Sequence, residues 1–421
     1  MTKPKMKGTR SRVAAALVGA ALGAGALVVP ASAVPASESS SSVASPAPPQ
    51  KADPLTRKAL RAEVERTLDE AGYIGISVEV RDGRHRVRAR AGEAKLGTGR
   101  PVPYGGSLRA ASVTKPFVAT VVLQLVAEGR LSLDDTVERW LPGVVAGNGN
   151  DGRRVTVRHL LQHTSGIHNY DDTDDTGGDA AAFQRHRFDR VTPEQVVAGA
   201  MRSKPDFPPA DPADPKPDWN YSNPNYVLAG MIVEKVTGRS WATEVQHRIV
   251  EPLGLTGTYA PGQDPFLPRP HARMYHRFPG SAGWTDTTVR NVSWGHAAES
   301  LVSTERDVDR FFTALFDGRL LPPRELAEMR RVVPVGDDFQ VIFPGLQYGL
   351  GLMRQPLTCG GHRWGHGGDS DGGTIRNGLT EDGSRSIVIN ATGKVPEVEP
   401  LLRAEAAVQR LVDTVLCEGV R

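Results

Sequence analysis

The order of apolar and polar residues predicts strands near both ends of this chain and helices between them. Helices are expected at 55–71 and at about 400–416, the second opening with a proline that a first helical turn tolerates. Strands are expected at 74–81, 86–91, 348–353, 363–366, 374–379 and 385–391, with an Asp82-Gly83 turn joining the first two. We therefore expect an α/β (α+β) fold with two lobes, in which a central antiparallel sheet flanked by helices lies beside an all-helical lobe at about 120–330.

A serine and a lysine stand three residues apart where one of the middle helices is expected to begin. Helical apolar spacing runs over 117–126 and ends at Gly129, and Pro116 is tolerated only in a first turn. The hydroxyl of Ser112 and the amine of Lys115 are therefore expected on one face of the helix start. A partly neutral Lys115 could take the serine proton and activate Ser112 as a nucleophile. A capping serine beside a solvated lysine is the alternative that this pattern alone leaves open.

A second polar cluster, Tyr221-Ser222-Asn223, follows a proline-rich loop and precedes an apolar helix that ends at Gly238. A loop pinned in this way can present rigid polar side chains to a cleft. Tyr221 offers a phenol whose pKa a nearby ammonium would lower, which would make it a base. Asn223 can bind a substrate amide through both ends of its carboxamide. An ordinary turn with a helix-capping asparagine is the alternative.

The third candidate is the segment Trp364-Gly365-His366-Gly367-Gly368, which is expected to form an edge strand of the sheet. Glycine in a strand often marks the close approach of another backbone or of a ligand. A substrate lying antiparallel along this edge would hydrogen-bond to its backbone. A glycine-rich hairpin without a binding role is the alternative.

The patterns Ser-x-x-Lys, Tyr-x-Asn and His-x-Gly each occur once, in this order, and here the chain resembles the penicillin-recognising serine hydrolases. The variants are most similar to the class C β-lactamase branch, and especially to secreted D-alanyl-D-alanine carboxypeptidases. The resemblance extends from about 55 to 417. Further family-like phrases are Leu131-Ser132-Leu133-Asp134-Asp135, Leu141-Pro142-Gly143, Leu160-Leu161-Gln162-His163-Thr164-Ser165-Gly166 and Tyr348-Gly349-Leu350-Gly351.

This resemblance implies a β-lactamase/transpeptidase-like fold and acyl transfer through Ser112. Lys115 and Tyr221 would share the proton transfers, and the backbone N–H groups of Ser112 and Asp369 would form an oxyanion hole. His366 occupies the basic position of the third motif and is expected to order Tyr221 electrostatically. The substrate-binding residues implied are Asn223, Trp294, His366, Gly367, Gly368 and Asp369.

Several departures from the family pattern concern the residues that would bind the terminal carboxylate of a substrate. The family's His-Thr-Gly-Thr is replaced by His366-Gly367-Gly368-Asp369, so both hydroxyls are absent. The arginine of related carboxypeptidases aligns with Met353, while Arg354 should point to the opposite face of its strand. Asp369 and Asp371 are expected to add negative charge there, and Glu299 stands where relatives usually have glycine.

Four hypotheses for the function follow. The class of protein that the chain most resembles is the exported D-alanyl-D-alanine carboxypeptidases. The pocket favours an esterase, amidase or D-aminopeptidase-like hydrolase of neutral or cationic acyl substrates. A class C-like β-lactamase and a non-catalytic penicillin-binding protein are the other two. The expected ligands are accordingly peptidoglycan-type peptides, esters or β-lactams.

The first 33 residues have the composition of a Sec-type signal peptide. A basic start precedes an Ala/Gly/Leu/Val run over 13–29 and the small-residue site Ala31-Ser32-Ala33. The run is short for a membrane span, so no stable membrane anchor is expected, with an uncleaved anchor as the alternative. Residues 34–53, rich in Ser, Ala and Pro, are expected to be a disordered linker, and 54–421 the catalytic domain. We expect a secreted, extracellular and monomeric protein.

Charge and cysteine content narrow the possible partners. The chain has 51 basic and 48 acidic residues, and loss of the five basic leader residues leaves 46 against 48, which gives no support for a nucleic-acid partner. Cys359 and Cys417 are expected to pair in an oxidising compartment, with two free buried thiols as the alternative. Neither Cys-x-x-Cys nor His-Glu-x-x-His occurs, so no metal and no cofactor are expected.

Overall fold

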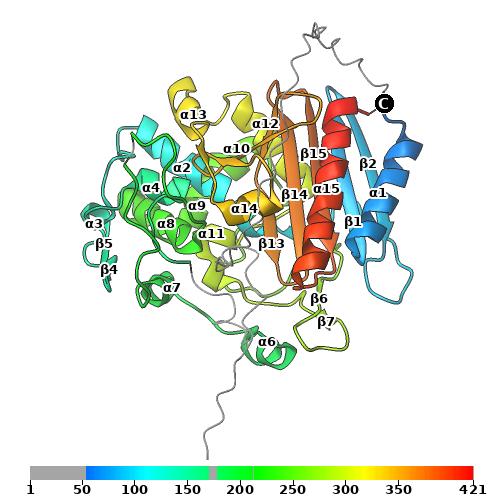
Figure 1. Ribbon diagram of the computed structural model, residues 1–421, viewed down its shortest axis with the longest axis horizontal. Helices are drawn as coiled ribbons and strands as arrows, with labels where there is room; N and C mark the ends of the chain where they lie inside the picture. Colours follow the sequence, from blue (N-terminus) through cyan, green and yellow to red (C-terminus); the bar gives the residue numbers. More distant parts are fainter. Residues whose placement is uncertain (1–53, 170–177, 212, 421) are drawn as a thin grey trace, which may run out of the picture.

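The computed structural model describes residues 54–169, 178–211 and 213–420 (Figure 1). The expected signal peptide and linker therefore lie outside the described residues. Within the described part, no helix is both long enough and apolar enough to span a membrane.

One large antiparallel sheet forms the centre of the fold. Its strand order is β2-β1-β15-β14-β12-β11-β10-β9, and β13 pairs with β14. The strands of this sheet are β1 (Gly75–Asp82), β2 (His85–Gly92), β9 (Val333–Pro334), β10 (Gln347–Tyr348), β11 (Met353–Pro356), β12 (His362–Gly365), β13 (Gly368–Ser370), β14 (Gly373–Thr380) and β15 (Arg385–Thr392). Strands from the two ends of the chain thus meet in one sheet, because β1 pairs along its full length with β15.

Helices cover both faces of the sheet. On one face α1 (Arg57–Ala71) and α15 (Val398–Glu418) lie side by side, and Ile387 and Ile389 of β15 pack into their apolar cluster (Figure 1). Val388, on the opposite face of β15, packs into the larger cluster formed with the helical lobe. This alternation along one strand is expected when both faces are buried.

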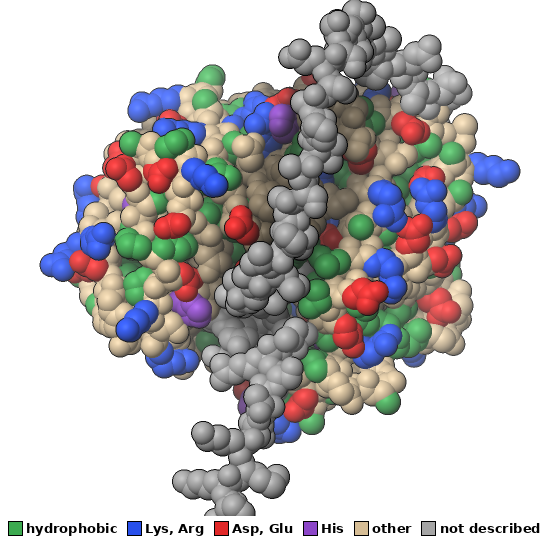
Figure 2. All heavy atoms as spheres, viewed as in Figure 1, with side chains coloured by type: hydrophobic (Ala, Val, Ile, Leu, Met, Phe, Trp, Pro, Cys, Tyr) green, Lys and Arg blue, Asp and Glu red, His purple; other side chains and the backbone are tan. Residues whose placement is uncertain are grey.

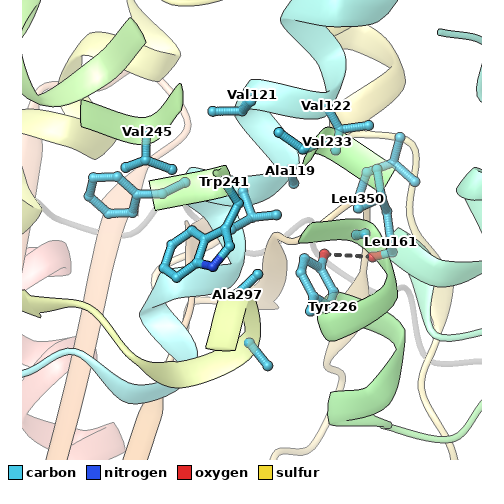
Figure 3. Close-up of a cluster of buried hydrophobic side chains, with 14 of the residues drawn as sticks. Ala119, Val121, Val122, Leu161, Tyr226, Val233, Trp241, Val245, Ala297 and Leu350 are labelled. Atoms are coloured by element: carbon cyan, nitrogen blue, oxygen red, sulfur yellow. Dashed lines mark hydrogen bonds between the residues drawn. The ribbon is translucent and has the colours of Figure 1, made fainter. Parts of the chain in front are cut away.

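The helical lobe is built around α2, which has eleven buried residues among its fourteen. Figure 3 shows how side chains of α2, α8 and α9 meet in the core, where the hydroxyl of Tyr226 donates to the carbonyl of Leu161 at 2.8 Å. The helices are α2 (Thr114–Ala127), α3 (Val137–Trp140), α4 (Val157–Gln162), α6 (Ala180–His186), α7 (Pro193–Ala200), α8 (Asn223–Thr237), α9 (Trp241–Val245), α10 (Glu251–Leu253), α11 (His296–Glu299), α12 (Glu305–Phe316), α13 (Pro323–Met329) and α14 (Asp337–Ile342), with the short turns η1 (Ala111–Val113), η2 (Gln246–Val250) and η3 (Ser293–Gly295).

The lobe expected to be all-helical also contains short strands. The pairs are β3 (Leu108–Arg109) with β8 (Val302–Ser303), β4 (Ala146–Gly147) with β5 (Asn150–Asp151), and β6 (Tyr275–His276) with β7 (Thr285–Asp286). The strand expected at 348–353 is also divided, into β10 and β11. Gly351 has a φ of +78° and lies against the hydroxyl of Tyr226, so Tyr348-Gly349-Leu350-Gly351 forms the bend between the two strands.

The structure contains the expected disulfide between Cys359 and Cys417, with the two Cα atoms 5.7 Å apart. It joins the turn between β11 and β12 to the last turn of α15. The final helix is therefore held to the sheet by a covalent link as well as by packing. On the outer surface, acidic and basic side chains are interspersed over the described part of the face shown in Figure 2.

Candidate active site

Ser112 lies in a tight turn at the junction of a strand and the central helix. It occupies η1, immediately before α2, as the position of Pro116 in the first turn of that helix predicts. Its neighbour Ala111 has a φ of +45°, a left-handed conformation that is costly for a residue with a side chain. Strain of this kind is typical of residues that hold a reactive side chain in a fixed direction.

Lys115 lies directly beside this hydroxyl, fully buried. Its Nζ is 2.9 Å from Ser112 Oγ, 2.7 Å from Asn223 Oδ1 and 3.2 Å from the carbonyl oxygen of Ala298. The two carbonyl-type oxygens can only accept hydrogen bonds, so they take two N–H groups of Lys115 and direct its third position at Ser112. This arrangement suits transfer of a proton between the serine and the lysine.

Tyr221 and Asn223 are placed by the loop ahead of α8. Tyr221 hydrogen-bonds to Ser112, and its ring lies 4.7 Å from Lys115 Nζ. Burial, followed by the charge of Glu299, raises the pKa of Tyr221 well above its ordinary value, although the hydrogen bond to Ser112 opposes this shift. The expected lowering of this pKa is therefore wrong, and a neutral phenol that donates a proton fits the site better than a phenolate.

His163 positions the Tyr221 loop, a role that the sequence did not reveal. Its ring centroid lies 4.3 Å from that of Tyr221, with the two ring planes tilted by 34°, and its Nδ1 accepts from the backbone N–H of Ser222 at 3.2 Å. Trp219 Nε1 donates to the carbonyl of Gln162 at 2.8 Å on the same side. The only hint of this role in the sequence was the family-like phrase that contains His163. In the structure the histidine is fully buried, and a buried histidine needs a specific hydrogen-bond partner.

The strand that approaches Ser112 is β13 rather than β12. β12 pairs with β11 on one side and β14 on the other, so the segment from Trp364 is not an edge strand as expected. β13 continues along the same edge of β14 and lies against η1. A Cβ on Gly368 would fall 2.3 Å from the carbonyl oxygen of Ala110 and 3.2 Å from Ser112 N. The prediction that glycine here permits close backbone approach is confirmed, and this places Asp369, the other expected oxyanion donor, next to the turn.

His366 does not act on Tyr221 by charge. Its Nδ1 bonds to the carbonyl of Gly367 at 2.6 Å, so this nitrogen carries the proton, and Nε2 accepts from the hydroxyl of Tyr348 at 2.8 Å. Burial and the charge of Lys115 lower the pKa of His366 to about 3. The histidine is therefore neutral, and its role is to connect the bend before β13 to Tyr348.

Glu299 contacts the candidate nucleophile. It is the last residue of α11, and its Oε1 accepts a hydrogen bond from Ser112 Oγ at 2.8 Å. The sequence marked Glu299 as a departure from the family but gave no indication that it would reach Ser112. A carboxylate thus shares this hydroxyl with Lys115 and Tyr221.

Residues 60–411, which make up most of this chain, match the Beta-lactamase family model. The chain belongs to the beta-lactamase family. Its fold agrees with that of solved structures of similar proteins, and the resemblance to the serine β-lactamase and penicillin-binding-protein superfamily proposed from the sequence is confirmed.

Two solved structures and one curated relative show the range of activities found in similar proteins. A D-stereospecific amidohydrolase from Streptomyces sp. is 41% identical, covers 83% of this chain and 98% of its own, and superposes with a TM-score of 0.72. D-amino acid amidase from Ochrobactrum anthropi SV3 is 26% identical, with 85% and 98% covered and a TM-score of 0.72. Esterase EstB of Burkholderia gladioli is 34% identical over 47% of this chain and 49% of its own. The chain spans about half or less of the length of the curated relatives that it matches.

The acidic residues of this beta-lactamase-family site carry less free charge than expected. Asp369 binds Arg376 at 2.9 Å and Lys394 at 3.1 Å, and Asp371 is paired with Arg290. Burial alone would raise the pKa of Asp369, but these two cations hold it well below its ordinary range. The expectation of added negative charge at Asp369 and Asp371 is therefore wrong, because neighbouring cations neutralise both.

The same ion pairs leave those cations unsuited to anchor a substrate carboxylate. Met353 packs in the cluster around Tyr221, whereas Arg354, on the opposite face of β11, hydrogen-bonds to Gln347 and His362. The sequence prediction for this pair is confirmed. Arg290 lies 4.8 Å above the ring of Trp294, so Trp294 borders the Asp371 ion pair. Among the described residues no cluster of three or more His, Cys, Asp or Glu could hold a metal ion.

The Arg376 network gives a stability prediction. Arg376 also pairs with Glu405 of α15, whose side chain is only 3% exposed. Arg376→Met should cost about 3–5 kcal/mol in urea unfolding, because it leaves a buried carboxylate without its partner. Arg410→Met on the same helix, which removes an exposed pair with Glu70, should cost at most about 1 kcal/mol.

The cost of Arg376→Met should also depend on pH. Asp369, whose pKa is depressed in the folded protein, contributes stability above the pKa of an unfolded aspartate, about 3.9. That contribution is lost as the pH falls toward the lower folded value, so the difference between wild type and variant should shrink below about pH 4. A difference that stays constant down to pH 3 would contradict the role given to this network.

Proposed function

We propose that the chain hydrolyses amide and ester bonds whose acyl half is a D-amino acid and whose leaving group carries no free carboxylate. The observation that supports this most is the charge around Ser112. A carboxylate, Glu299, touches the nucleophile, and the cations nearest to β13 are occupied by Asp369 and Asp371. A carboxypeptidase needs a cation for the terminal carboxylate of its substrate. Two of the similar structures, a D-stereospecific amidohydrolase and a D-amino acid amidase, have names that describe activities of the proposed class.

In the proposed reaction, Lys115 begins as a neutral amine, Ser112 Oγ attacks the carbonyl carbon, and the serine proton passes to Lys115. The C–N bond then breaks, and the leaving amine takes a proton from Tyr221, which Lys115 replaces. Water attacks the acyl-enzyme by the reverse route, so that the acid is released and Ser112 regains its proton. The backbone N–H groups of Ser112 and Asp369 would stabilise the oxyanion at each stage.

We also propose that the protein is exported and acts as a monomer.

A matched pair of substrates tests the proposal. D-Ala-D-Ala with a free C-terminus should be hydrolysed at least about tenfold less efficiently, in kcat/KM, than the same dipeptide as its C-terminal amide. Loss of a charge-assisted contact to the carboxylate accounts for a difference of this size. A carboxypeptidase would show the opposite order, and a clear preference for the free acid would overturn the proposal.

Covalent labelling separates the remaining hypotheses. A fluorophosphonate should label the protein at Ser112, whereas a fluorescent penicillin, whose carboxylate also needs a cation, should label it weakly. Strong labelling by both reagents would favour a penicillin-sensitive peptidase. Labelling by neither would indicate a non-catalytic protein.

A further inference from the structure

The position of Glu299 is fixed from several directions. The helix α11 packs against both η1 and α2, and the carbonyl of Ala298 accepts from Lys115. A Cβ on Gly295 would lie 3.0 Å from the Cβ of Glu299, so the preceding turn closes over the glutamate side chain. The contact between Oε1 and Ser112 Oγ is therefore built into the fold of α11 rather than left to a free surface side chain.

Glu299 differs from the other acidic residues near β13. Asp369 and Asp371 are bound by Arg and Lys side chains, which cancel their charge. Glu299 instead places its carboxylate at the point where a substrate must bond. A carboxylate there repels an anionic acyl group and accepts a hydrogen bond from a neutral N–H group. A cationic group gains more, because its hydrogen bond joins two opposite charges.

Covalent geometry determines which cation fits. In an acyl group that is joined to Oγ, the carbonyl carbon is one bond away, and an amino nitrogen on the α-carbon lies about 3–4 Å from Oγ. Glu299 Oε1 lies 2.8 Å from the same Oγ. An α-ammonium that lies on the Glu299 side of Oγ is thus within hydrogen-bonding reach of Oε1 while the carbonyl carbon is attacked.

We propose that Glu299 forms a subsite for the α-ammonium group of the acyl half of the substrate. This inference rests on the proposed function and deepens it, because it names the group by which a D-aminoacyl substrate is recognised. N-Acylated peptides, which lack this ammonium, would be poor substrates even when their leaving group is suitable.

The same contact couples recognition to activation. Ser112 has one proton, and while Oγ donates it to Glu299 the proton is directed away from Lys115. A bound ammonium that takes Oε1 releases the hydroxyl, which can then turn its proton toward Lys115. Glu299 gains and loses no proton in this step, since the serine proton moves to Lys115, which then replaces the proton that Tyr221 gives to the leaving amine.

The test compares D-phenylalaninamide with N-acetyl-D-phenylalaninamide in wild type and in Glu299→Gln. Wild type should prefer the free amine. In the variant, kcat/KM for the free amine should fall about 10- to 100-fold, while that for the acetylated amide should stay within about threefold or rise. Glu381→Gln, which changes an exposed glutamate beside Arg354, is the matched control and should alter neither rate. Equal losses on both substrates would overturn the subsite and indicate that Glu299 accepts the serine proton, and no loss on either would overturn it outright.

A binding measurement does not depend on turnover. D-phenylalaninol should protect Ser112 of wild type from fluorophosphonate labelling, N-acetyl-D-phenylalaninol should protect it poorly, and Glu299→Gln should remove the difference. Protection by the amine without hydrolysis of either amide would overturn the proposed function and support the subsite. Hydrolysis of both amides at the same rate, with no preferential protection, would overturn the subsite and leave the amidase activity.

Discussion

Replacing Ser112 by alanine should abolish fluorophosphonate labelling and lower amide hydrolysis by at least about 10³-fold. Ser112 is the hydroxyl on which Lys115, Tyr221 and Glu299 converge, so no neighbouring group can take its place as the nucleophile. Binding of substrate should survive, because the alanine variant keeps the backbone N–H groups and Glu299. Labelling is followed by intact-protein mass and hydrolysis by release of the amine.

Ser370→Ala is the matched control for this experiment. The Ser370 hydroxyl, on β13, is directed to the sulfur of Met274 and the carbonyl oxygen of Gly373. This variant should keep both labelling and hydrolysis close to wild type. Labelling of Ser112→Ala at a different serine would overturn the assignment of the nucleophile.

Lys115→Ala and Tyr221→Phe should each lower hydrolysis of D-aminoacyl amides by about 10²- to 10⁴-fold, the range typical of a lost general acid or base. Lys115 is bonded to Ser112, and Tyr221 also reaches this hydroxyl, so each side chain acts on a proton that the other must exchange. The double variant should be little worse than the more severe single variant, because residues that act as one unit are not additive. Losses that multiply would show two independent roles.

Because Tyr221 is neutral, its role can be distinguished from that of Lys115 by a change of substrate. A phenol that protonates the leaving amine matters for an amide and matters little for a p-nitrophenyl ester, whose leaving group departs without a proton. Tyr221→Phe should therefore be severe on the amide and mild on the ester, whereas Lys115→Ala should be severe on both. Equal effects of Tyr221→Phe on the two substrates would contradict the role of proton donor.

Local sequence patterns were sufficient for most of the fold and for part of the site. Strand lengths, turn residues and the helix that must begin near Pro116 depend on neighbours in the chain, and these predictions agree with β1, β2, β14, β15 and α2. The three motifs meet at Ser112, as their resemblance to a known family implied. Gly368 allows the close approach that glycine in a strand indicates.

The wrong predictions about the site mostly concern electrostatics between side chains that only the folded structure brings together. The charge of Asp369 is cancelled by Arg376 and Lys394, and the pKa of Tyr221 is raised by burial and by Glu299. None of these partners is adjacent in the chain, so their proximity depends on strand register and on the docking of α11. Burial also keeps His366 neutral. Its place at the position where the family motif has a basic residue gave no sign of this.

The pairing of β1 with β15 has a consequence for how this hydrolase matures. The first strand of the sheet can pair on that side only after the last strand has been made, and Arg376, which supports Asp369, meets Glu405 only when the final helix docks. Contacts across such long sequence separations carry a large loop-closure cost and slow folding. A chain that is still being synthesised therefore has its serine, lysine and tyrosine in place along the sequence but no assembled site. We therefore expect the proposed hydrolytic activity only after the complete fold has formed.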